Sequence, residues 1–263
     1  MTLTTLSRSI AGSTAVVTGA ASGMGRATVR LLVDEGARVA ALDVNAEALD
    51  QVVAEVERDG AGDAGEAVRG WALDLADRDA IDETFAAIAE HFGGIDILIN
   101  NAGVSLFAPI DSDEFETAWE RSLSVLLTAH TRTIRAALPW LRQARHPRIV
   151  NVASTEGFGA TKYGSPYTAA KTGVIGLTRS LAVELGGEGI TVNCICPGPI
   201  HTGMTEAIPD DAKQEFARRR TALKRYGDPE EVAHMTLALV LPAAGFTTGV
   251  ALPVDGGLTI RNA

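Results

Sequence analysis

Three polar residues in the second half of the chain have the types and the spacing of an acid–base site. Tyr167 and Lys171 lie four residues apart in a stretch of helical periodicity, so the two side chains share one face of the predicted helix. A phenol titrates near pH ~10, and an ammonium group beside it lowers that pKa by stabilising the phenolate. Ser154, 13 residues before Tyr167, could hold a substrate oxygen or stabilise a developing alkoxide. We therefore expect Tyr167 to act as a general acid or base.

A glycine-rich turn near the start of the chain has the composition of a phosphate-binding loop. It follows the predicted strand over residues 14–18 and opens a predicted helix over residues 25–35. Glycines allow the backbone to approach a pyrophosphate closely, and the helix N-terminus offers unpaired N–H groups and a positive dipole end. The turn residues expected to bind a dinucleotide are Gly19, Ser22, Gly23, Met24 and Gly25.

Asp43 ends the second predicted strand, 18 residues after the last glycine of that turn. A carboxylate at this place accepts hydrogen bonds from both hydroxyls of the adenosine ribose and repels a 2′-phosphate. The neighbouring residues Leu42, Val44 and Asn45 carry no positive charge. The sequence therefore favours NAD(H) over NADP(H) as the cofactor.

Short apolar runs alternate with longer amphipathic stretches along the chain. Strands are predicted at residues 14–18, 38–42, 70–73, 95–99, 148–152 and 191–195, and helices at residues 25–35, 46–58, 78–92, 115–142 and 167–185. The strands are mostly apolar and do not alternate, which is typical of a parallel sheet covered on both faces. We expect an α/β fold with a doubly wound, Rossmann-like parallel sheet in three layers, forming one domain over residues 1–263.

On these motifs the sequence resembles the short-chain dehydrogenase/reductase superfamily, from about residue 12 to residue 257. The glycine turn has that family's spacing, and Tyr167 and Lys171 form its YxxxK motif 13 residues after Ser154. Further matching segments are Asn100-Asn101-Ala102-Gly103 after the fourth predicted strand, Pro197-Gly198-Pro199-Ile200-His201-Thr202, Thr248-Gly249 and Val254-Asp255-Gly256-Gly257. The order and register of these segments make the resemblance specific.

The resemblance implies a set of residues around a bound nicotinamide dinucleotide. Lys171 would hold the nicotinamide ribose beside Tyr167, and Asp74 would contact the adenine ring. The other residues implied at the cofactor are Leu75, Asn101, Ala102, Gly103, Pro197, Gly198, Ile200 and Thr202. The implied reaction is the reversible oxidation of a secondary alcohol to a ketone, in which a hydride passes to the nicotinamide and Tyr167 takes the alcohol proton.

The substrate side should be built by three segments around the nicotinamide, residues 104–110, 155–164 and 199–225. Their large apolar side chains indicate a partly apolar pocket and an apolar or cyclic alcohol as substrate. These side chains are Phe107, Phe158, Tyr163, Met204 and Phe216. We expect the last segment to form a loop with a short helix that closes over the bound pair. Its run Arg218-Arg219-Arg220 is expected to be a solvated helix face, with a contact to a substrate carboxylate or phosphate as the alternative.

One position departs from the family pattern. The family usually carries an asparagine seven residues after the tryptophan of the long helix, where it helps to hold a water of the proton relay. Here that tryptophan is Trp119 and the position is Leu126, which cannot hydrogen-bond a water. Either the alignment slips, or the relay is rerouted, or the enzyme is slow or uses a polar group of its substrate. The residues that could reroute the relay are Ser122, Ser124 and Thr128.

Composition and charge limit the partners and the cellular location that we expect for this protein. The 263 residues include 33 acidic and 23 basic side chains, a net charge of −10, which argues against nucleic acid and anionic membranes as partners. No leader segment and no long apolar run is apparent, so we expect a cytoplasmic protein. Cys194 and Cys196 are expected to be small buried thiols, and no metal site is expected.

Two other functions remain open on the sequence. A 3-oxoacyl-carrier-protein reductase would normally use NADPH and present a basic patch to an acidic carrier, which Asp43 and the net charge disfavour. A catalytically weak NAD-binding regulator would have no reason to retain Ser154, Tyr167 and Lys171 together. The family commonly assembles through its long helices, so the resemblance implies a homotetramer or a dimer that acts on a small-molecule alcohol or ketone.

Overall fold

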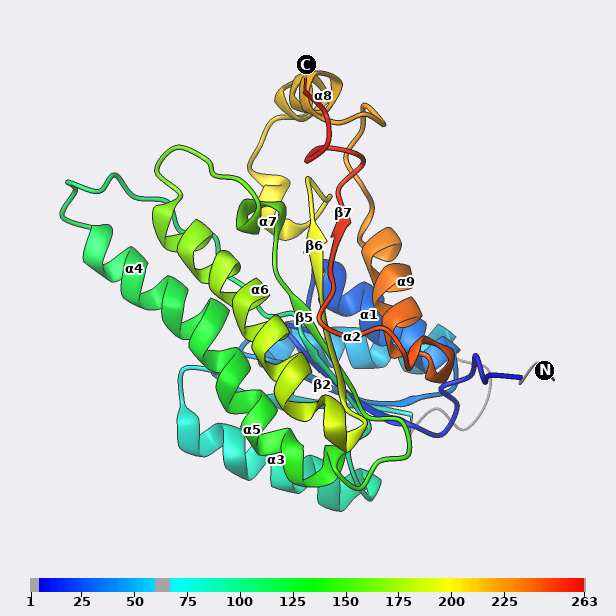
Figure 1. The fold of residues 1–263 in the computed structure, drawn as a ribbon. Helices are drawn as coiled ribbons and strands as arrows, with labels where there is room; N and C mark the ends of the chain where they lie inside the picture. Colours follow the sequence, from blue (N-terminus) through cyan, green and yellow to red (C-terminus); the bar gives the residue numbers. More distant parts are fainter. Residues whose placement is uncertain (1–4, 60–66, 263) are drawn as a thin grey trace.

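Figure 1 shows the protein as a computed structural model, which describes residues 5–59 and 67–262. Within those residues, seven parallel strands form one sheet in the order β3-β2-β1-β4-β5-β6-β7. The strands are β1 (Thr14–Thr18), β2 (Arg38–Asp43), β3 (Val68–Ala72), β4 (Ile97–Asn100), β5 (Arg148–Val152), β6 (Thr191–Pro197) and β7 (Ala251–Val254). The strand order changes direction between β1 and β4, which confirms the predicted doubly wound sheet.

Helices cover both faces of this sheet and complete a three-layered single domain (Figure 1). The helices are α1 (Gly23–Asp34), α2 (Ala46–Asp59), α3 (Arg78–Phe92), α4 (Phe115–Leu123), α5 (Ala129–Leu141), α6 (Ser165–Leu185), α7 (Gly203–Glu206), α8 (Asp210–Arg220) and α9 (Pro229–Val240). Short 3₁₀ turns are η3 (Thr155–Gly157), η4 (Gly186–Glu188) and η5 (Pro242–Ala244), and η2 (Ser124–Thr128) is a π-helical turn. In the described part of the chain, no helix has the length and hydropathy needed to cross a membrane.

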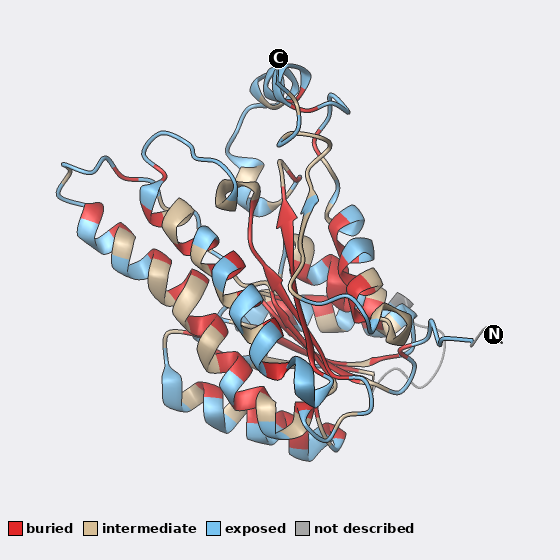
Figure 2. Cartoon of the chain, viewed as in Figure 1, coloured by how far each residue is buried: buried red, intermediate tan, exposed pale blue. Residues whose placement is uncertain are grey.

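Alternate residues of each strand pack on opposite faces, and this divides the core in two. Ala15 and Val17 of β1 lie in one apolar cluster with residues of α1, α2 and α9. Val16 lies in the other cluster, with residues of α3, α5 and α6 such as Phe85. Figure 2 shows the inner strands as almost continuously buried, with exposed residues on the outer sides of the helices, whereas the edge strands β3 and β7 are only partly buried. The apolar strand runs of the sequence therefore reflect burial on both faces.

Most element boundaries agree with the sequence prediction, and β4 is an informative exception. The predicted strand begins at residue 95, whereas β4 begins at Ile97. Ile95 is buried, but Asp96 is drawn to the start of β1: its carboxylate accepts the N–H of Thr14 at 2.8 Å, and its own N–H donates to the Thr14 carbonyl at 2.9 Å. The apolar run predicted the burial correctly, but the strand starts only after this contact.

The single helix predicted over residues 115–142 is wrong in one respect. The chain forms α4, the π-helical turn η2 and then α5, and the N–H of Ala129 donates to the carbonyl of Ser124 five residues earlier. Apolar periodicity does not reveal this wider turn, because the buried residues on either side of it keep nearly the spacing of an ordinary α-helix. Ser122, Leu126 and His130 follow one another at four-residue steps and are all buried.

Helix α9 was not among the helices predicted. Its start carries a recognisable signal, because Asp228 and Glu231 form a reciprocal capping box and Pro229 occupies the first helical turn. The N–H of Asp228 donates to the Glu231 carboxylate at 2.9 Å. The helix packs against α1 and covers the sheet next to β5 and β6, so it belongs to the core of the domain.

A ladder of buried polar side chains joins two strands to two helices below the edge where ligands bind in such sheets. Asn100 at the end of β4 donates to the Asn151 carboxamide oxygen of β5 at 3.0 Å. The Thr133 hydroxyl of α5 donates to Asn100 at 2.7 Å, and Asn151 donates to the Thr178 hydroxyl of α6 at 3.0 Å. All four residues are at most 2% exposed, so each hydrogen bond satisfies a group that water cannot reach.

We predict that Asn151→Ala lowers the free energy of unfolding by about 2–3 kcal/mol, because it leaves Asn100 and Thr178 with unpaired buried groups. Urea denaturation followed by circular dichroism measures the change. The control is Gln143→Ala, which removes an exposed amide and should stay within about 0.5 kcal/mol of the wild type. Equal stability of the two variants would contradict the structural role of the ladder.

Candidate active site

The predicted site residues lie in the loops that follow the carboxyl ends of the strands. Gly19 follows β1, Asn101 follows β4, Ser154 follows β5 and Gly198 follows β6. Because all strands are parallel, these ends meet at one edge of the sheet. In doubly wound sheets the ligand crevice lies at this edge, where the strand order changes direction. The topology therefore brings the dinucleotide motifs and the acid–base residues to one side of the molecule.

The glycine turn is too tightly packed to accept side chains at its key positions. Gly19 and Gly23 have left-handed backbones, with φ of 65° and 49°. A Cβ atom on Gly25 would collide with the carbonyl oxygen of Gly19, and one on Gly19 would lie 2.6 Å from the Cα atom of Ala102. The turn thus lies directly against the segment after β4 and leaves its backbone open to a phosphate group.

Asn101 fastens these two segments together. Its side-chain amide donates to the carbonyl oxygens of Thr18 at 2.9 Å and of Gly19 at 3.0 Å. The backbone N–H groups of Asn101 and Ala102 donate to the Thr18 hydroxyl at 3.0 and 3.1 Å. The sequence predicts Asn101 as a cofactor ligand, and the structure shows its amide donors used to hold the glycine turn in shape.

A cleft on the β2 side of the turn is lined by the two carboxylates predicted at the adenosine. Asp43 accepts the N–H of Ala21 at 3.0 Å through one oxygen and the N–H of Asn45 at 3.0 Å through the other. Asp74 accepts the N–H of Ala76 at 2.9 Å. These bonds fix both carboxylates before any ligand binds. The other lining residues are Gly19, Leu42, Val44, Leu73, Leu75, Ala102, Gly103, Val104, Arg121 and Val125.

Arg121 is a residue of this cleft that sequence reasoning missed. It lies on α4, far along the chain from Asp43, and is exposed where it lines the same cleft. The sequence shows only that no cation neighbours Asp43 along the chain, whereas the fold brings an arginine to the cleft that Asp43 lines. No local pattern could have shown this, because it depends on how α4 packs next to the carboxyl ends of β2 and β3.

Ser154, Tyr167 and Lys171 come together where β5 meets the first turns of α6. Ser154 has an extended backbone, and its hydroxyl accepts the N–H of Glu156 at 3.1 Å. The Lys171 ammonium is 3% exposed, donates to the Val152 carbonyl at 2.7 Å and lies 5.7 Å from the centre of the Tyr167 ring. The structure therefore groups all three predicted acid–base residues, with the lysine innermost.

The electrostatics of this group differ from the sequence expectation. Burial raises the pKa of Tyr167 above its ordinary value of 10.0, a hydrogen bond with Ser154 opposes that shift, and the Glu156 carboxylate adds to it. Burial also lowers the pKa of Lys171 to about 8. The expected lowering of the tyrosine pKa by the lysine does not appear in the protein alone, because Lys171 is directed at the Val152 carbonyl and desolvation dominates.

Residues of the Pro197–Thr202 stretch approach the glycine turn from the other side. A Cβ atom on Gly23 would lie 3.0 Å from the methyl carbon of Thr202, so these two predicted cofactor residues are neighbours. Gly198 lies close to the turn after β7, since a Cβ there would be 2.8 Å from the Cα atom of Asp255. Pro197 ends β6, and Ile200 is buried and pairs with Gly227. Ser22 and Met24 lie at the start of α1.

Two of the predicted substrate segments pack on each other beside the tyrosine. The N–H of Ala108 donates to the Tyr163 carbonyl at 2.9 Å, and the Phe107 ring stacks on the Tyr167 ring with centroids 6.2 Å apart. Phe107, Phe158 and Tyr163 are between 46% and 49% exposed, so this wall presents aromatic surface to solvent. The aromatic lining expected from the sequence is therefore present next to the acid–base group.

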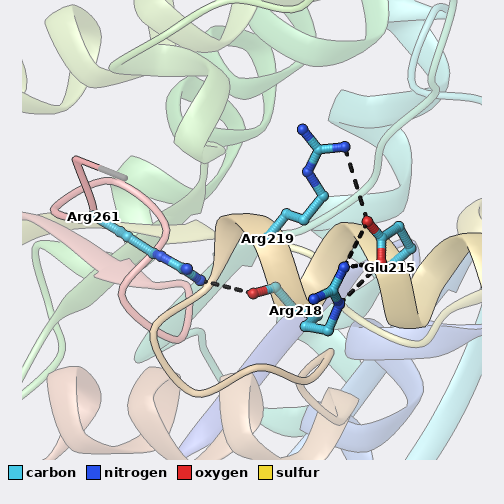
Figure 3. Close-up of polar contacts among 4 residues, drawn as sticks. All are labelled: Glu215, Arg218, Arg219 and Arg261. Atoms are coloured by element: carbon cyan, nitrogen blue, oxygen red, sulfur yellow. Dashed lines mark hydrogen bonds and ion pairs between the residues drawn. The ribbon is translucent and has the colours of Figure 1, made fainter.

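The third segment contains α7 and α8, and its basic run is occupied by local contacts. Figure 3 shows Arg218 and Arg219 paired with Glu215, at 2.7 and 3.8 Å. The Arg261 guanidinium donates to the carbonyls of Arg218 at 2.9 Å and Thr221 at 2.7 Å. These contacts agree with a solvated helix face. Phe216 packs on Tyr226 and is 40% exposed.

Leu126 lies where the resemblance places it, behind the segment after β4. It is fully buried, and a Cβ on Gly103 would touch its side chain at 3.6 Å. Among the candidates for a rerouted relay, Ser122 is fully buried and its hydroxyl has no hydrogen-bond partner among the described residues, whereas Ser124 and Thr128 are half-buried.

The two cysteines of the chain both lie in β6. Cys194 and Cys196 of β6 are fully buried free thiols, and a hydrogen bond with the Cys194 thiol, together with burial, raises the pKa of Cys196. Within residues 5–59 and 67–262, no group of three or more His, Cys, Asp or Glu side chains is placed to hold a metal ion.

Comparison with known proteins identifies the class to which this fold and site belong. A family profile described as enoyl-(acyl carrier protein) reductase matches residues 19–259. The chain is 40% identical over 253 residues to the 3-oxoacyl-(acyl-carrier-protein) reductase of Thermotoga maritima, covering 95% of this chain and 98% of the relative. It is 36% identical over 244 residues to the meso-2,3-butanediol dehydrogenase of Serratia marcescens, covering 93% of each.

A solved structure agrees with these relatives. The crystal structure of a dehydrogenase/reductase from Sinorhizobium meliloti 1021 superposes with a TM-score of 0.88 at 36% identity, over 98% of both chains. The chain therefore belongs to the short-chain dehydrogenase/reductase family, whose members are oxidoreductases of alcohols and ketones that use a nicotinamide cofactor. The close glycine turn, the adjacent Thr202 and the fixed carboxylates fit a dinucleotide of that kind.

We predict that Tyr167 in the cofactor-free protein ionises only above pH ~10, because burial opposes formation of the phenolate. The measurement is the ultraviolet absorbance of phenolate during a pH titration, taken as the difference between the wild type and Tyr167→Phe. A difference signal that is half complete below pH ~10 would contradict the dominance of burial.

Proposed function

We propose that the chain is an NAD(H)-dependent dehydrogenase that interconverts a secondary alcohol and a ketone by hydride transfer. The observation that carries the proposal is the meeting of Ser154, Tyr167 and Lys171 at the same sheet edge as the glycine turn. The bound nicotinamide supplies or accepts the hydride. The chain's own residues have to hold the substrate oxygen, move one proton and exclude water.

Each of the three residues has a distinct role in this proposal. Tyr167 accepts the alcohol proton in oxidation and returns it in reduction, as a general acid or base. Ser154, which shares a hydrogen bond with Tyr167, holds the substrate oxygen and stabilises charge that develops on it. Lys171 supplies a positive charge one helical turn from Tyr167 and holds the nicotinamide ribose.

The residues proposed to hold the cofactor follow the cleft from the adenosine to the nicotinamide end. Asp43 and Asp74 serve the adenosine, and the glycine turn with Thr202 serves the pyrophosphate. The full proposed set is Gly19, Ser22, Gly23, Met24, Gly25, Asp43, Asp74, Leu75, Asn101, Ala102, Gly103, Tyr167, Lys171, Pro197, Gly198, Ile200 and Thr202. No metal takes part in the proposed reaction.

NAD(H) is favoured over NADP(H) by the way Asp43 is held. Both of its oxygens accept backbone N–H groups, and one of these belongs to the glycine turn, so the carboxylate stays at the ribose position. A 2′-phosphate there would meet a negative charge. Arg121 lines the same cleft and offers a cation, but the hydrogen bonds of the Asp43 carboxylate go to the backbone N–H groups of Ala21 and Asn45.

The substrate proposed for this site is an apolar or cyclic secondary alcohol. Phe107, Phe158 and Tyr163 present aromatic surface beside Tyr167, and Met204 is 50% exposed in the third substrate segment. Residues 199–225 are proposed to close over the bound pair. We further propose a homotetramer or dimer and a cytoplasmic location, the latter supported by the two free thiols of β6.

The proposal is tested with a panel of cyclohexanol, 1-phenylethanol, 2-octanol and 2,3-butanediol, each with NAD⁺ and with NADP⁺, followed by absorbance of the reduced cofactor. We expect turnover with NAD⁺, reduced by roughly 10²–10⁴ in Tyr167→Phe. Binding of NAD⁺ without turnover of any alcohol or corresponding ketone would favour the regulator hypothesis and overturn the proposed reaction.

Cofactor choice gives a second prediction. Asp43→Ser should lower kcat/KM for NAD⁺ by about tenfold or more, the equivalent of the lost charged hydrogen bonds, and should raise kcat/KM for NADP⁺. Asp50→Ser is the control, because it removes the same charge from the exposed side of α2. An unchanged ratio of the two cofactors in Asp43→Ser would refute the assignment of Asp43.

A 3-oxoacyl-carrier-protein reductase is the second candidate function. It is favoured by the 40% identity to the Thermotoga maritima enzyme of that name. The same assay with acetoacetyl-coenzyme A and NADPH separates the two candidates. Faster oxidation of NADPH with this thioester than reduction of NAD⁺ with any secondary alcohol would establish the reductase.

A further inference from the structure

A buried histidine beside the proposed lysine has no role in the site as described so far. His130 lies in the first turns of α5 and is 2% exposed. Its Nε2 atom is buried and has no hydrogen-bond partner among the described residues. A buried polar atom of this kind is rare in a folded protein and calls for a partner that the protein alone does not supply.

The position of His130 on its helix is tied to that of Leu126. The two residues are four apart, and the π-helical turn η2 lies between α4 and α5 at this point. Leu126 packs against Gly103, η2 packs against α6, which carries Lys171, and α5 packs against β4. His130 therefore belongs to the same buried stripe as Leu126, one helical turn further from α4.

His130 and Lys171 reach the carboxyl ends of two neighbouring strands. The imidazole hydrogen-bonds the backbone of Asn100 at the end of β4, Lys171 donates to the Val152 carbonyl at the end of β5, and Asn100 pairs with Asn151 between these strands. Burial and the Lys171 ammonium lower the pKa of His130 to about 3, against a weaker contribution from the backbone of Asn100. The imidazole is thus neutral at neutral pH. A neutral imidazole that carries its proton on Nδ1 presents Nε2 as a hydrogen-bond acceptor. Beside a lysine it can neither repel the ammonium nor take its charge.

Lys171 has N–H donors that require further acceptors. An ammonium group has three N–H donors, and in the described part of the chain one of them is given to the Val152 carbonyl. The group is 3% exposed, so the remaining donors cannot all turn to bulk solvent. A water molecule between a lysine donor and an imidazole acceptor satisfies both, and buried waters are held by polar partners of this kind.

We propose that His130 is the positioning residue that takes over from the amide missing at Leu126: its Nε2 atom accepts a hydrogen bond from a buried water that Lys171 also holds. This inference rests on the proposed function and adds to it a residue of the proton path. It differs from the rerouting through Ser122, Ser124 or Thr128 considered from the sequence.

The proton balance of a turnover shows what the water does. In oxidation one proton passes from the alcohol to Tyr167, and one proton has to reach solvent before the tyrosine can act again. An ammonium proton of Lys171 leaves to the water, the lysine regains a proton from the tyrosine side, and the water releases one proton to solvent. The charge of Lys171 is the same at the start and the end, and His130 stays neutral and holds the water.

The kinetic test compares variants of His130 with a variant of its neighbour in the stripe. His130→Val should lower kcat by about ten- to hundred-fold with little change in KM for the alcohol, because the water and its hydrogen bond with the Lys171 ammonium are lost with the imidazole. His130→Gln keeps a polar group at the position and should retain most of kcat. Ser122→Ala removes an unpartnered buried hydroxyl of the same stripe and should leave kcat within about twofold, well below the tenfold that one such bond is worth.

Rescue separates a role in the proton path from a role in folding. Leu126→Asn should keep or raise kcat in the wild type and should restore most of the loss in the His130→Val background, because it returns a polar group to the family's position. If His130→Val keeps the wild-type kcat, or if it binds NAD⁺ normally and Leu126→Asn restores nothing, the proposal is overturned.

A spectroscopic measurement decides the question without turnover. In cofactor-free protein labelled with ¹⁵N in histidine, a hydrogen-bonded Nε2 acceptor has its nitrogen resonance displaced from that of a free imidazole nitrogen. We expect this displacement in the wild type and its loss in Lys171→Met. The same resonance in both proteins would overturn the His130 proposal even if the enzyme is active. An intact displacement in a protein that oxidises no alcohol would leave the contact in place and overturn the proposed function instead.

Discussion

Gly25 lies so close to the carbonyl oxygen of Gly19 that no side chain fits between them, and this approach determines where the rest of the site can be. The same turn touches Ala102 and is held there by Asn101 and Thr18. The start of α1 is thereby fixed against the end of β4. The proposed dinucleotide crevice and the proposed acid–base group then have a constant separation, because both are attached to the same parallel sheet.

The burial of Lys171 determines the proton affinity of this residue. Lys171 is 3% exposed, and the loss of water around its ammonium group disfavours the charged form. Its pKa therefore falls to about 8. The same desolvation raises the pKa of Tyr167 and lowers that of His130. Burial acts on all three groups, and the charge of Lys171 adds to the effect of burial on His130.

The sequence predicted the fold and the location of the site better than it predicted the electrostatics. Apolar runs set β1 and β5 at their observed bounds, since burial on both faces leaves a clear signal. Arg121 and His130 were missed because neither belongs to a local motif, and each gains its surroundings only when α4 and α5 pack on the domain. The direction of the Tyr167 pKa was wrong because spacing reveals a neighbouring charge but does not measure desolvation.

Arg261 joins the last described residues of the chain to the segment that is proposed to close over the substrate. Its guanidinium binds two carbonyls at the C-terminal end of α8, where the helix dipole also favours a cation. Figure 1 shows the C-terminus beside this helix. A displacement of α8 therefore either breaks these bonds or carries the tail with it. The two parts of the chain move together as long as these bonds hold, although some 40 residues and the core helix α9 separate them.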